Sequence, residues 1–448
     1  MSSEWPLKKI SDVAEFLNSK RIPLKSLDRQ KRQGQYPYYG ASGVVDHIDD
    51  YIFDGTYLLI SEDGENLRTR NTPIAFKASG KFWVNNHAHI LAEKEEGILD
   101  YLEYYFSVLD LTPYITGAVQ PKLNKANLDS IEIPIPDKEE RLAINRVLNS
   151  MTNKIQLNRQ TNQTLEQIAQ AIFKSWFVDF EPVKAKMAAL AEGGTAEQAE
   201  LAAMSVISTK DETALKQLQT QAPEHYQQLA QTAALFPAEM QESELGEVPE
   251  GWGEIPLYET AEYVNGAAFK AKDFTSDNSG LPIIKIAELK QGISAGTKYT
   301  KAEVKEKYFI TNDDVLYSWS GSPETSLEVF KWFGGDGWLN QHIFKLNFES
   351  EEQKYFTYYL LKHMKPVLIA TAQQKQTTGL GHVTVADMKR IKITHPPVEM
   401  LNRFRTVVSP LYEKGSNCEK ENSCLIELRD NLLPKLLSGE LSPQVSEV

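Results

Sequence analysis

Three stretches within residues 1–127 are rich in side chains that can hydrogen-bond to nucleic-acid bases or phosphates. Arginine pairs well with guanine edges and asparagine or glutamine with adenine edges, whereas lysine, serine and threonine suit phosphate oxygens. The stretches predict contact with DNA, although any one of them alone also fits a solvated surface loop. The candidate residues in this half are Lys20, Arg21, Lys25, Arg29, Arg32, Asn66, Arg68, Arg70, Lys122, Asn124 and Lys125.

Two polar loops in the second half offer the same chemistry and have no helix or strand pattern. They run over Ser318–Ser326 and Gln373–Gly379. Because several such loops occur in each half, nucleic-acid contact is favoured over an ordinary surface. The candidates here are Ser320, Ser322, Thr325, Ser326, Gln373, Gln374, Lys375, Gln376 and Thr378.

No stretch carries the residue pattern of a catalytic site. The phosphate loop, the Gly-x-Ser-x-Gly elbow, a nuclease core and an aromatic–proline methyltransferase signature are all missing, and Gly379-Leu-Gly381 lacks the third glycine of a dinucleotide fingerprint. Cys418 and Cys424 lie six residues apart and would point to different faces of a helix, which favours packing over metal binding. The sequence therefore predicts a chain that is not an enzyme and holds no cofactor or metal.

An internal repeat must position these loops. Leu128–Phe177 and Met388–Leu437 align without a gap at an offset of 260 residues. Upstream, Trp83-Val-Asn85-Asn-His87 recurs as Trp338-Leu-Asn340-Gln-His342. On a strand, the two histidines would be either buried and hydrogen-bonded or in contact with the DNA backbone. Matched features are expected to be scaffold, so the unmatched loops 66–71 and 318–326 are the better candidates for base contact.

Each aligned stretch steps 4-3-4-3 through apolar positions, which is typical of a coiled-coil seam. Asn158, Asn162 and Asn422 occupy seam positions and either fix the register or face a wet part of the seam. Pro410 and Gly415 predict a kink or break in the second helix. The expected seam residues are Ile144, Leu148, Met151, Ile155, Leu165, Ile172, Phe404, Val408, Leu411, Leu425, Leu432 and Leu436.

The predicted fold is α/β with two globular domains, two long antiparallel helices and a pseudo-twofold repeat. The net charge of −13 is concentrated in residues 1–137 and 183–250, so it does not exclude a local basic face for DNA. Since neither a signal peptide nor a membrane span is recognisable, we expect a cytoplasmic location. The expected boundaries are 1–137 (first domain), 138–182 (first helix), 183–245 (acidic insert of two or three short helices), 246–397 (second domain) and 398–448 (second helix and tail).

Three segments resemble the specificity subunit of Type I restriction–modification enzymes. They are Ile172-Phe-Lys-Ser-Trp-Phe-Val-Asp-Phe-Glu-Pro182, Leu245-Gly-Glu-Val-Pro-Glu-Gly-Trp252 and Leu432-Leu-Pro-Lys-Leu-Leu-Ser-Gly-Glu-Leu441. The loop Ser320-Gly-Ser-Pro-Glu-Thr-Ser326 and Asn340-Gln-His342 also resemble parts of that family's target recognition domains.

The resemblance implies a non-catalytic subunit whose two domains each read one half of a bipartite double-stranded DNA site. The helices would set the spacer and dock two methyltransferase subunits, which hold S-adenosylmethionine, and restriction/translocase subunits would join the larger complex. Two other interpretations stay open at this point. One is a coiled-coil adaptor that binds only proteins, and the other is a methyltransferase or nuclease with an unrecognised site.

Overall fold

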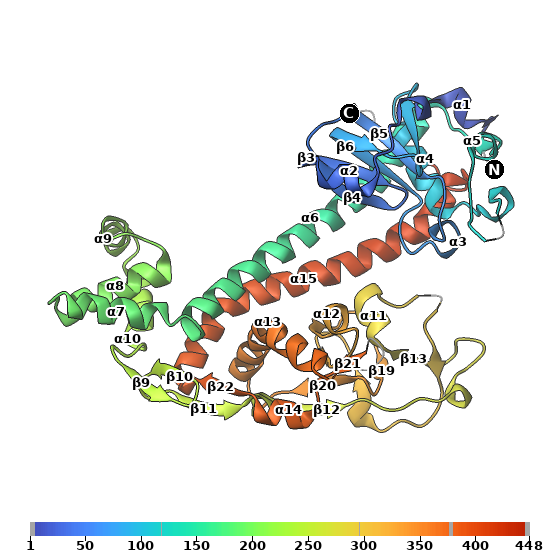
Figure 1. Cartoon of the computed structure of the whole chain (residues 1–448). Coiled ribbons are helices and arrows are strands. Elements are labelled where there is room, and N and C mark those ends of the chain that lie inside the picture. The colour runs from blue at the N-terminus through green and yellow to red at the C-terminus, as the bar shows by residue number, and fades with distance from the viewer. Residues whose placement is uncertain (1–4, 118, 295, 376–379, 444–448) are drawn as a thin grey trace. The chain divides into compact units, whose positions relative to one another are not determined.

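The computed structural model describes residues 5–117, 119–294, 296–375 and 380–443. The chain forms two compact units: the first combines Met1–Gln156 with Cys424–Val448, and the second is Leu157–Ser423. The long helices α6 (Lys138–Phe177) and α15 (Val398–Leu437) each contribute a segment to both units (Figure 1). No described helix combines the length and the apolar character needed to cross a lipid bilayer.

A six-stranded sheet forms the first domain, with the strand order β2-β7-β5-β6-β3-β4. All neighbours are antiparallel except β3 and β6, which pair in parallel at Tyr38 and Trp83. Leu58 and Ile60 of β5 enter one buried cluster and Leu59 enters another, because successive strand side chains point to opposite faces. The elements are β1 (Leu7–Lys8), α1 (Ile10–Val13), β2 (Ala14–Phe16), η1 (Asn18–Lys20), α2 (Ser26–Gln30), β3 (Gln33–Gly40), β4 (Gly43–Ile48), β5 (Phe53–Ser61), α3 (Asn66–Thr69), β6 (Ala75–Val84), β7 (Ala88–Glu93), α4 (Ile98–Val108), η2 (Thr112–Tyr114), α5 (Lys125–Asp129) and β8 (Ile133–Pro134).

The second domain repeats this order in two sheets, β12-β20-β16-β18 and β14-β13-β19-β15. Two strands, β18 and β19, take the place of β6, and β19 pairs in parallel with β13 at Trp338 and Ile283 as β6 does with β3. The elements are β11 (Gly253–Pro256), η3 (Leu257–Thr260), β12 (Glu262–Asn265), η4 (Ala271–Asp273), β13 (Leu281–Ile284), α11 (Ile286–Gln291), β14 (Tyr299–Thr300), η5 (Glu306–Tyr308), β15 (Phe309–Ile310), β16 (Val315–Ser318), β17 (Ser320–Gly321), α12 (Pro323–Ser326), β18 (Glu328–Lys331), β19 (Gly337–Leu339), β20 (Ile343–Asn347), α13 (Glu351–Gln373), β21 (Gly381–His382), α14 (Val385–Arg390) and β22 (Lys392–His395).

The two long helices pair in each unit, and the contacts of the second unit show that they run antiparallel. In the first unit, Ile144 of α6 shares a buried cluster with Leu436 of α15. In the second, Asn158 Nδ2 donates to Asn422 Oδ1 at 3.1 Å and Asn162 Nδ2 donates to Glu419 Oε1 at 2.6 Å. The residue numbers of α6 therefore rise as those of α15 fall. The predicted fold class, with two α/β domains, an internal repeat and two long antiparallel helices, is confirmed.

Aromatic rings fill the part of this helix pair that lies in the second unit. Phe404 is fully buried, and its ring centroid lies 5.8 Å from that of Phe173 and 5.0 Å from that of Phe177. Asn158 and Asn422 are 2% and 3% exposed, so neither faces a wet part of the seam, which favours the register role for this pair. The twelve proposed seam residues are all buried or half-buried, and their role in setting a spacer stays a prediction.

Helix α15 runs without interruption from Val398 to Leu437, so the break expected at Pro410 and Gly415 is wrong. The proline removes one backbone donor, the partner of the Thr406 carbonyl, and both Pro410 and Thr406 are exposed. Water can satisfy that carbonyl, and the helix continues. Packing in the protein interior was expected of both cysteines. It is confirmed for Cys418, which is buried, and wrong for Cys424, which is exposed.

The insert contains four helices rather than two or three, followed by a hairpin. Thr195 forms the expected capping box with Gln198, but Thr209 ends α8 in a left-handed conformation and Asp211 caps the next helix instead. Within the insert, Lys186 of α7 is 3% exposed and donates to the Phe236 carbonyl at 2.7 Å, which ties the first helix to the segment after the last one. The elements of the insert are α7 (Glu181–Ala191), α8 (Ala196–Ser208), α9 (Glu212–Gln221), α10 (Pro223–Ala234), β9 (Met240–Ser243) and β10 (Gly246–Pro249).

We predict that Gly415→Ala stabilises the protein. A Cβ at Gly415 would lie 3.4 Å from Lys331 Nζ and 3.6 Å from Asn162 Oδ1, which is ordinary van der Waals contact. Glycine in a helix costs about 0.5–1 kcal/mol relative to alanine, so the unfolding free energy in urea should rise by about that amount. Gly97→Ala is the matched control and should destabilise, because Gly97 has a φ of +79° and its Cβ would lie 2.7 Å from Leu142. A loss of stability on Gly415→Ala would contradict the prediction.

Candidate nucleic-acid interface

Three loops meet at one edge of the first domain: 62–72 after β5, the turn 85–87 between β6 and β7, and 115–124 before α5. Backbone hydrogen bonds join them through Glu62, whose amide donates to the His87 carbonyl at 2.9 Å and whose carbonyl accepts from Leu123 at 2.8 Å. The two outer loops also touch in an antiparallel bridge between Asp63 and Lys122. Side chains that are far apart in the sequence are thus brought to one edge.

The second domain forms the same three-loop edge. The Trp319 amide donates to the His342 carbonyl at 3.4 Å, and the Trp319 carbonyl accepts from the Val383 amide at 3.0 Å. Ser320 then pairs with His382 in the β17–β21 ladder. Trp319, Ser320 and His382 therefore occupy the positions of Glu62, Asp63 and Lys122. The loops that do not match in sequence lie at equivalent positions in the fold.

The matched Asn-x-His elements form turns rather than strands. Asn85 Oδ1 accepts from the His87 amide at 2.8 Å, and Asn340 Oδ1 accepts from the His342 amide at 3.4 Å. Both imidazoles are exposed. The prediction that these histidines lie on strands is therefore wrong, and so is the alternative in which they are buried. The asparagine at the start of each turn is suited to this position because its short side-chain amide can hydrogen-bond to the backbone two residues further on.

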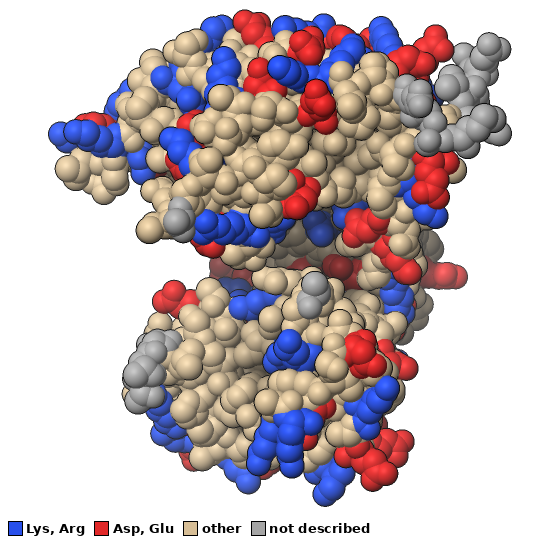
Figure 2. Space-filling view, turned by 90° about the vertical axis from the view of Figure 1, so that its right-hand side faces the viewer, with Lys and Arg blue, Asp and Glu red and all other residues tan. Residues whose placement is uncertain are grey.

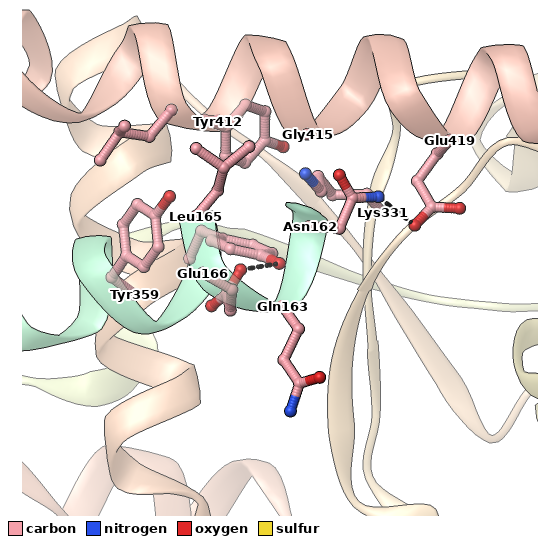
Figure 3. A pocket seen from close by; sticks show the side chains of 11 residues that line it. Asn162, Gln163, Leu165, Glu166, Lys331, Tyr359, Tyr412, Gly415 and Glu419 are labelled. Atoms are coloured by element: carbon pink, nitrogen blue, oxygen red, sulfur yellow. Dashed lines mark hydrogen bonds between the residues drawn. The ribbon is translucent and has the colours of Figure 1, made fainter. Parts of the chain in front are cut away.

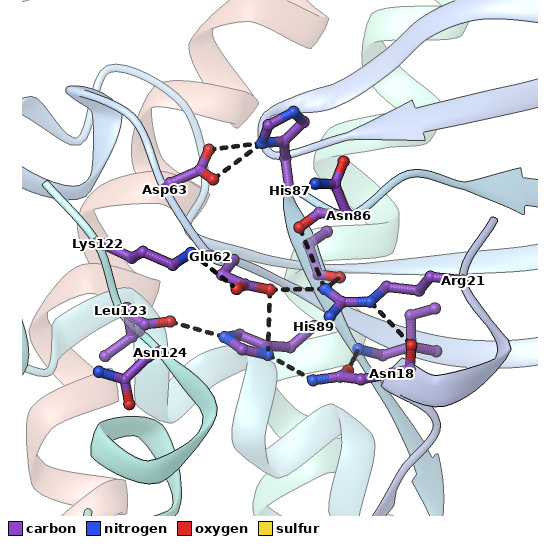
Figure 4. A network of polar contacts seen from close by, with 12 residues as sticks. Asn18, Arg21, Glu62, Asp63, Asn86, His87, His89, Lys122, Leu123 and Asn124 are labelled. Atoms are coloured by element: carbon purple, nitrogen blue, oxygen red, sulfur yellow. Dashed lines mark hydrogen bonds and ion pairs between the residues drawn. The ribbon is translucent and has the colours of Figure 1, made fainter. Parts of the chain in front are cut away.

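A charged network lies beneath the loops of the first domain (Figure 4). Arg21 Nη1 contacts Glu62 Oε2 at 2.6 Å, and Lys122 Nζ lies 3.5 Å from the other oxygen of that carboxylate. His89 is 1% exposed, with Nε2 2.7 Å from the Leu123 carbonyl and Nδ1 2.8 Å from the Asn18 amide nitrogen. Side-chain contacts therefore reinforce the backbone bonds that join these loops.

The protonation of this network follows from its surroundings. Burial raises the pKa of Glu62, but the hydrogen bond from Arg21 and the nearby positive charges shift that pKa downward overall. Burial lowers the pKa of His89, against the opposing effects of the Leu123 carbonyl and the Glu62 charge. At neutral pH Glu62 is charged and His89 is neutral, so Nε2–H donates to Leu123 and Nδ1 accepts from Asn18.

Several residues proposed to contact DNA have partners inside the first domain. These side chains hold the loops in place, and we assign them a positioning role. The contacts are Arg21 to Glu62 at 2.6 Å, Arg29 to Asp46 at 2.9 Å, Arg32 to Asp49 at 2.9 Å, Arg70 to the Leu109 carbonyl at 2.6 Å, Asn66 to the Thr72 carbonyl at 3.0 Å, and Asn124 as the cap of the Asn127 amide at 2.9 Å.

The other proposed residues of the first domain are exposed. Arg68 donates to the Gly117 carbonyl at 2.9 Å, which ties the loop 62–72 to the loop 115–124. Lys125 lies over the Phe16 ring at 4.9 Å. Exposed side chains here are Lys20, Lys25, Arg68, Lys122 and Lys125.

The proposed residues of the second domain divide in the same way. Ser326 is buried and Ser320 half-buried, whereas Ser322, Thr325, Gln373, Gln374 and Lys375 are exposed. Lys375 Nζ contacts Asp387 at 2.6 Å. Burial raises the pKa of Asp387, but the hydrogen bonds from Lys375 and Thr384 lower it to about 2 overall. Gln373 Nε2 lies 3.4 Å from Glu324, so the two polar loops meet. Gln376 and Thr378 lie outside the described residues.

Two residues of this edge, Trp319 and His382, were not among the candidates, and His342 was considered only as one alternative, a contact to the DNA backbone. Trp319 is partly exposed, and the two imidazoles are exposed beside its ring. A tryptophan inside the polar loop Ser318–Ser326 was the available sequence signal.

Basic side chains are spread over the face of both domains shown in Figure 2. On the lower body, Lys and Arg alternate with uncharged surface, while most acidic side chains gather toward one side. The face shown is therefore mixed in charge, with many basic side chains exposed despite the net charge of −13.

A polar cavity of about 240 Å³ lies away from the loops, between the second domain and the helix segments of the same unit (Figure 3). Lys331 of β18 lies 4.2 Å above the Tyr412 ring, and burial lowers the pKa of its ammonium against the attraction of Glu166. Its strand register makes it the equivalent of Lys77 in the first domain, whose ammonium contacts Asp100. We assign this cavity to the scaffold.

A sequence model described as the Type I restriction modification DNA specificity domain matches residues 2–167 and 249–403. The chain is 33% identical over 442 residues to the Type I restriction enzyme HindI specificity subunit of Haemophilus influenzae, covering 96% of this chain and 93% of that protein. It is 24% identical over 461 residues to the MjaIX specificity subunit of Methanocaldococcus jannaschii, covering 98% and 94%. A crystal structure of the S subunit of a Type I restriction–modification system from M. genitalium shares the fold, with a TM-score of 0.55, 15% identity and coverage of 99% and 97%.

We predict that His89 makes the stability of the first unit depend on pH. The imidazole pKa in the folded state lies below the unfolded value of 6.5, so the unfolded chain binds more protons at this residue than the folded chain as the pH falls from 7 to 5. The unfolding free energy should therefore decline, by at most about 1.4 kcal/mol per pH unit for one proton. His89→Gln should remove this part of the slope in urea titrations at each pH. Equal slopes for both proteins would contradict the prediction.

Proposed function

The chain belongs to the Type I restriction–modification DNA specificity family, and we propose that each of its two domains reads one half of a bipartite DNA site. In this family the subunit confers DNA sequence specificity without catalysing a reaction, and it acts with DNA and the other subunits of its complex. We further propose which loops contact the DNA and how the contacts of the two domains differ.

One observation carries the proposal: equivalent loop positions hold unlike side chains on a shared backbone. Glu62 corresponds to Trp319, and Lys122 corresponds to His382, yet the hydrogen bonds that join the loops are the same. A duplicated scaffold with exchanged side chains is what two readers of different base sequences require, because base edges discriminate by donor, acceptor and methyl pattern.

The proposed contacts are exposed side chains of the three-loop edges, together with Lys20 and Lys25 before α2 and Lys125 at the start of α5. Lysines serve phosphates and set the register on the duplex, whereas arginine, glutamine and hydroxyl side chains can reach base edges in the major groove. We assign phosphate contact to Lys20, Lys25, Lys122 and Lys125, and base contact to Arg68, Ser322, Thr325 and Gln374. The buried Ser326 and the half-buried, intramolecularly bound residues position these side chains; they are Arg21, Arg29, Arg32, Asn66, Arg70 and Asn124.

The long helices complete the proposed assembly. We propose that residues 138–182 and 398–448 separate the two recognition domains, 1–137 and 246–397, and thereby set the spacer between the half-sites. Two methyltransferase subunits would dock on this scaffold and supply S-adenosylmethionine, and restriction/translocase subunits would join them. The acidic insert 183–245 extends the helical part. Because the target is the DNA of the cell, the proposed site of action is the cytoplasm.

The first test is the methylated motif of the host genome. A split motif with a fixed unspecified gap is expected, with half-sites about 34–36 Å apart if both domains enter the major groove on one face of the duplex. A continuous motif, or the absence of any site bound specifically by the complex, would contradict the proposal.

We predict that base-contact variants act on one half-site only. Arg68→Ala should weaken binding to the first half-site and Gln374→Ala to the second, each by about 1–3 kcal/mol, measured on duplexes in which the other half-site is scrambled. Lys122→Ala should weaken binding regardless of the base sequence and reduce the salt slope by about one. Lys216→Ala, an exposed change in α9, is the control. Equal losses on both half-sites from Arg68→Ala would contradict the assignment.

A further inference from the structure

The equivalent edges of the two domains differ most in the chemistry at their centre. The first domain has the charged Arg21–Glu62 pair with His89 behind it. In the second, Trp319 stands at the position of Glu62, and its ring centroid lies 5.7 Å from that of Phe344. An aromatic cluster therefore replaces the charged network.

The Trp319 ring is fixed in place and presents only carbon to its surroundings. Its Nε1–H donates to Asn265 Oδ1 at 3.0 Å, and the ring packs against Phe344. Indole has no other polar group, so the exposed part of the side chain can offer only apolar contact. Because these two contacts hold the ring inward, it is poorly placed to stack on an extruded base.

Two imidazoles flank this apolar surface. The ring centroids of His342 and His382 lie 5.8 and 6.4 Å from that of Trp319, and both histidines are exposed. Among the described residues, the His342 imidazole makes one hydrogen bond, a weak one to Gln341 at 3.4 Å. Imidazole can donate or accept, so the cluster combines an apolar centre with polar groups on its sides.

We propose that the second domain recognises the 5-methyl group of a thymine through Trp319, with His342 and His382 bonding to groups beside it. This inference rests on the proposed function, since it places a base of the second half-site against this edge. The thymine methyl is the apolar feature of the major groove, and the guanine, cytosine and adenine edges present polar groups there. An apolar ring between hydrogen-bonding groups is complementary to a methyl flanked by base or phosphate oxygens.

The probe is a set of duplexes that carry the split methylated motif, with each thymine of the second half-site replaced in turn by deoxyuridine. This replacement removes one methyl and leaves the base pairing unchanged. For the full chain purified with its accompanying subunits, one replacement should raise Kd about fourfold, the factor for about 0.8 kcal/mol per methyl-sized group. Replacements in the first half-site provide the matched comparison.

The variants connect this effect to the residue. Trp319→Ala should weaken binding to the second half-site and abolish the difference between thymine and deoxyuridine, whereas Trp319→Phe should retain part of that difference. If Trp319→Ala fails to fold by circular dichroism, the exposed double variant His342→Ala/His382→Ala provides the test and should weaken binding to the second half-site only.

The outcomes separate the two proposals. Specific binding in which no deoxyuridine replacement in the second half-site changes Kd, or in which Trp319→Ala keeps the full difference, overturns this inference and leaves the bipartite reading in place. If the complex binds no split site at all, the proposed function fails and this inference fails with it.

Discussion

Backbone hydrogen bonds join the three loops of each domain in the same way, and side chains reinforce them differently in the two domains. In the first domain the backbone amide and carbonyl of Glu62 bond to the other two loops, at His87 and Leu123. In the second domain the backbone of Trp319 makes the equivalent two bonds. Since every residue except proline carries a backbone donor and acceptor, this arrangement does not depend on the side chain at the bridging position. A carboxylate and an indole can therefore occupy the same place without disturbing the edge.

Buried residues at equivalent positions of the two domains have similar shapes, whereas exposed residues at equivalent positions differ. Ser61 and Ser318, the last residues of β5 and β16, are both fully buried, as are Leu123 and Val383 in the third loop. These pairs have similar size, as close packing requires. The contrast between matched buried pairs and unmatched exposed ones is the structural basis for separating scaffold from reader.

The fold was largely predictable because its signals are periodic and repeated. The offset of 260 residues found over the helices extends in the structure to Leu123 and Val383, beyond the region in which the sequences visibly align. The continuity of helix α15 was harder to predict because Pro410 and Gly415 have low intrinsic helix propensity. Tertiary packing outweighs that propensity here. The turns at His87 and His342 were missed because strand-like apolar residues flank them on both sides and neither turn contains a glycine or proline.

The binding residues were less predictable than the fold. Charge alone does not distinguish Arg68, which is exposed, from Arg70, whose guanidinium bonds the end of α4. That difference depends on the left-handed conformation of Arg70, with a φ of 50°, which turns its side chain toward the helix carbonyls. Trp319 was missed because tryptophan is usually expected in a hydrophobic core. Its partial exposure depends on where the loop crosses the edge of the sheet, which the sequence does not indicate.

The way the loops are joined also bears on how such a chain can evolve. Substitutions at the bridging positions are nearly neutral for the architecture, so lineages can accumulate them without an intermediate that fails to fold. Each half can drift separately, because the contacts described for its loops lie within its own domain. New combinations of ancestral halves would then be inherited as working proteins, and variety would arise by exchange as well as by point mutation.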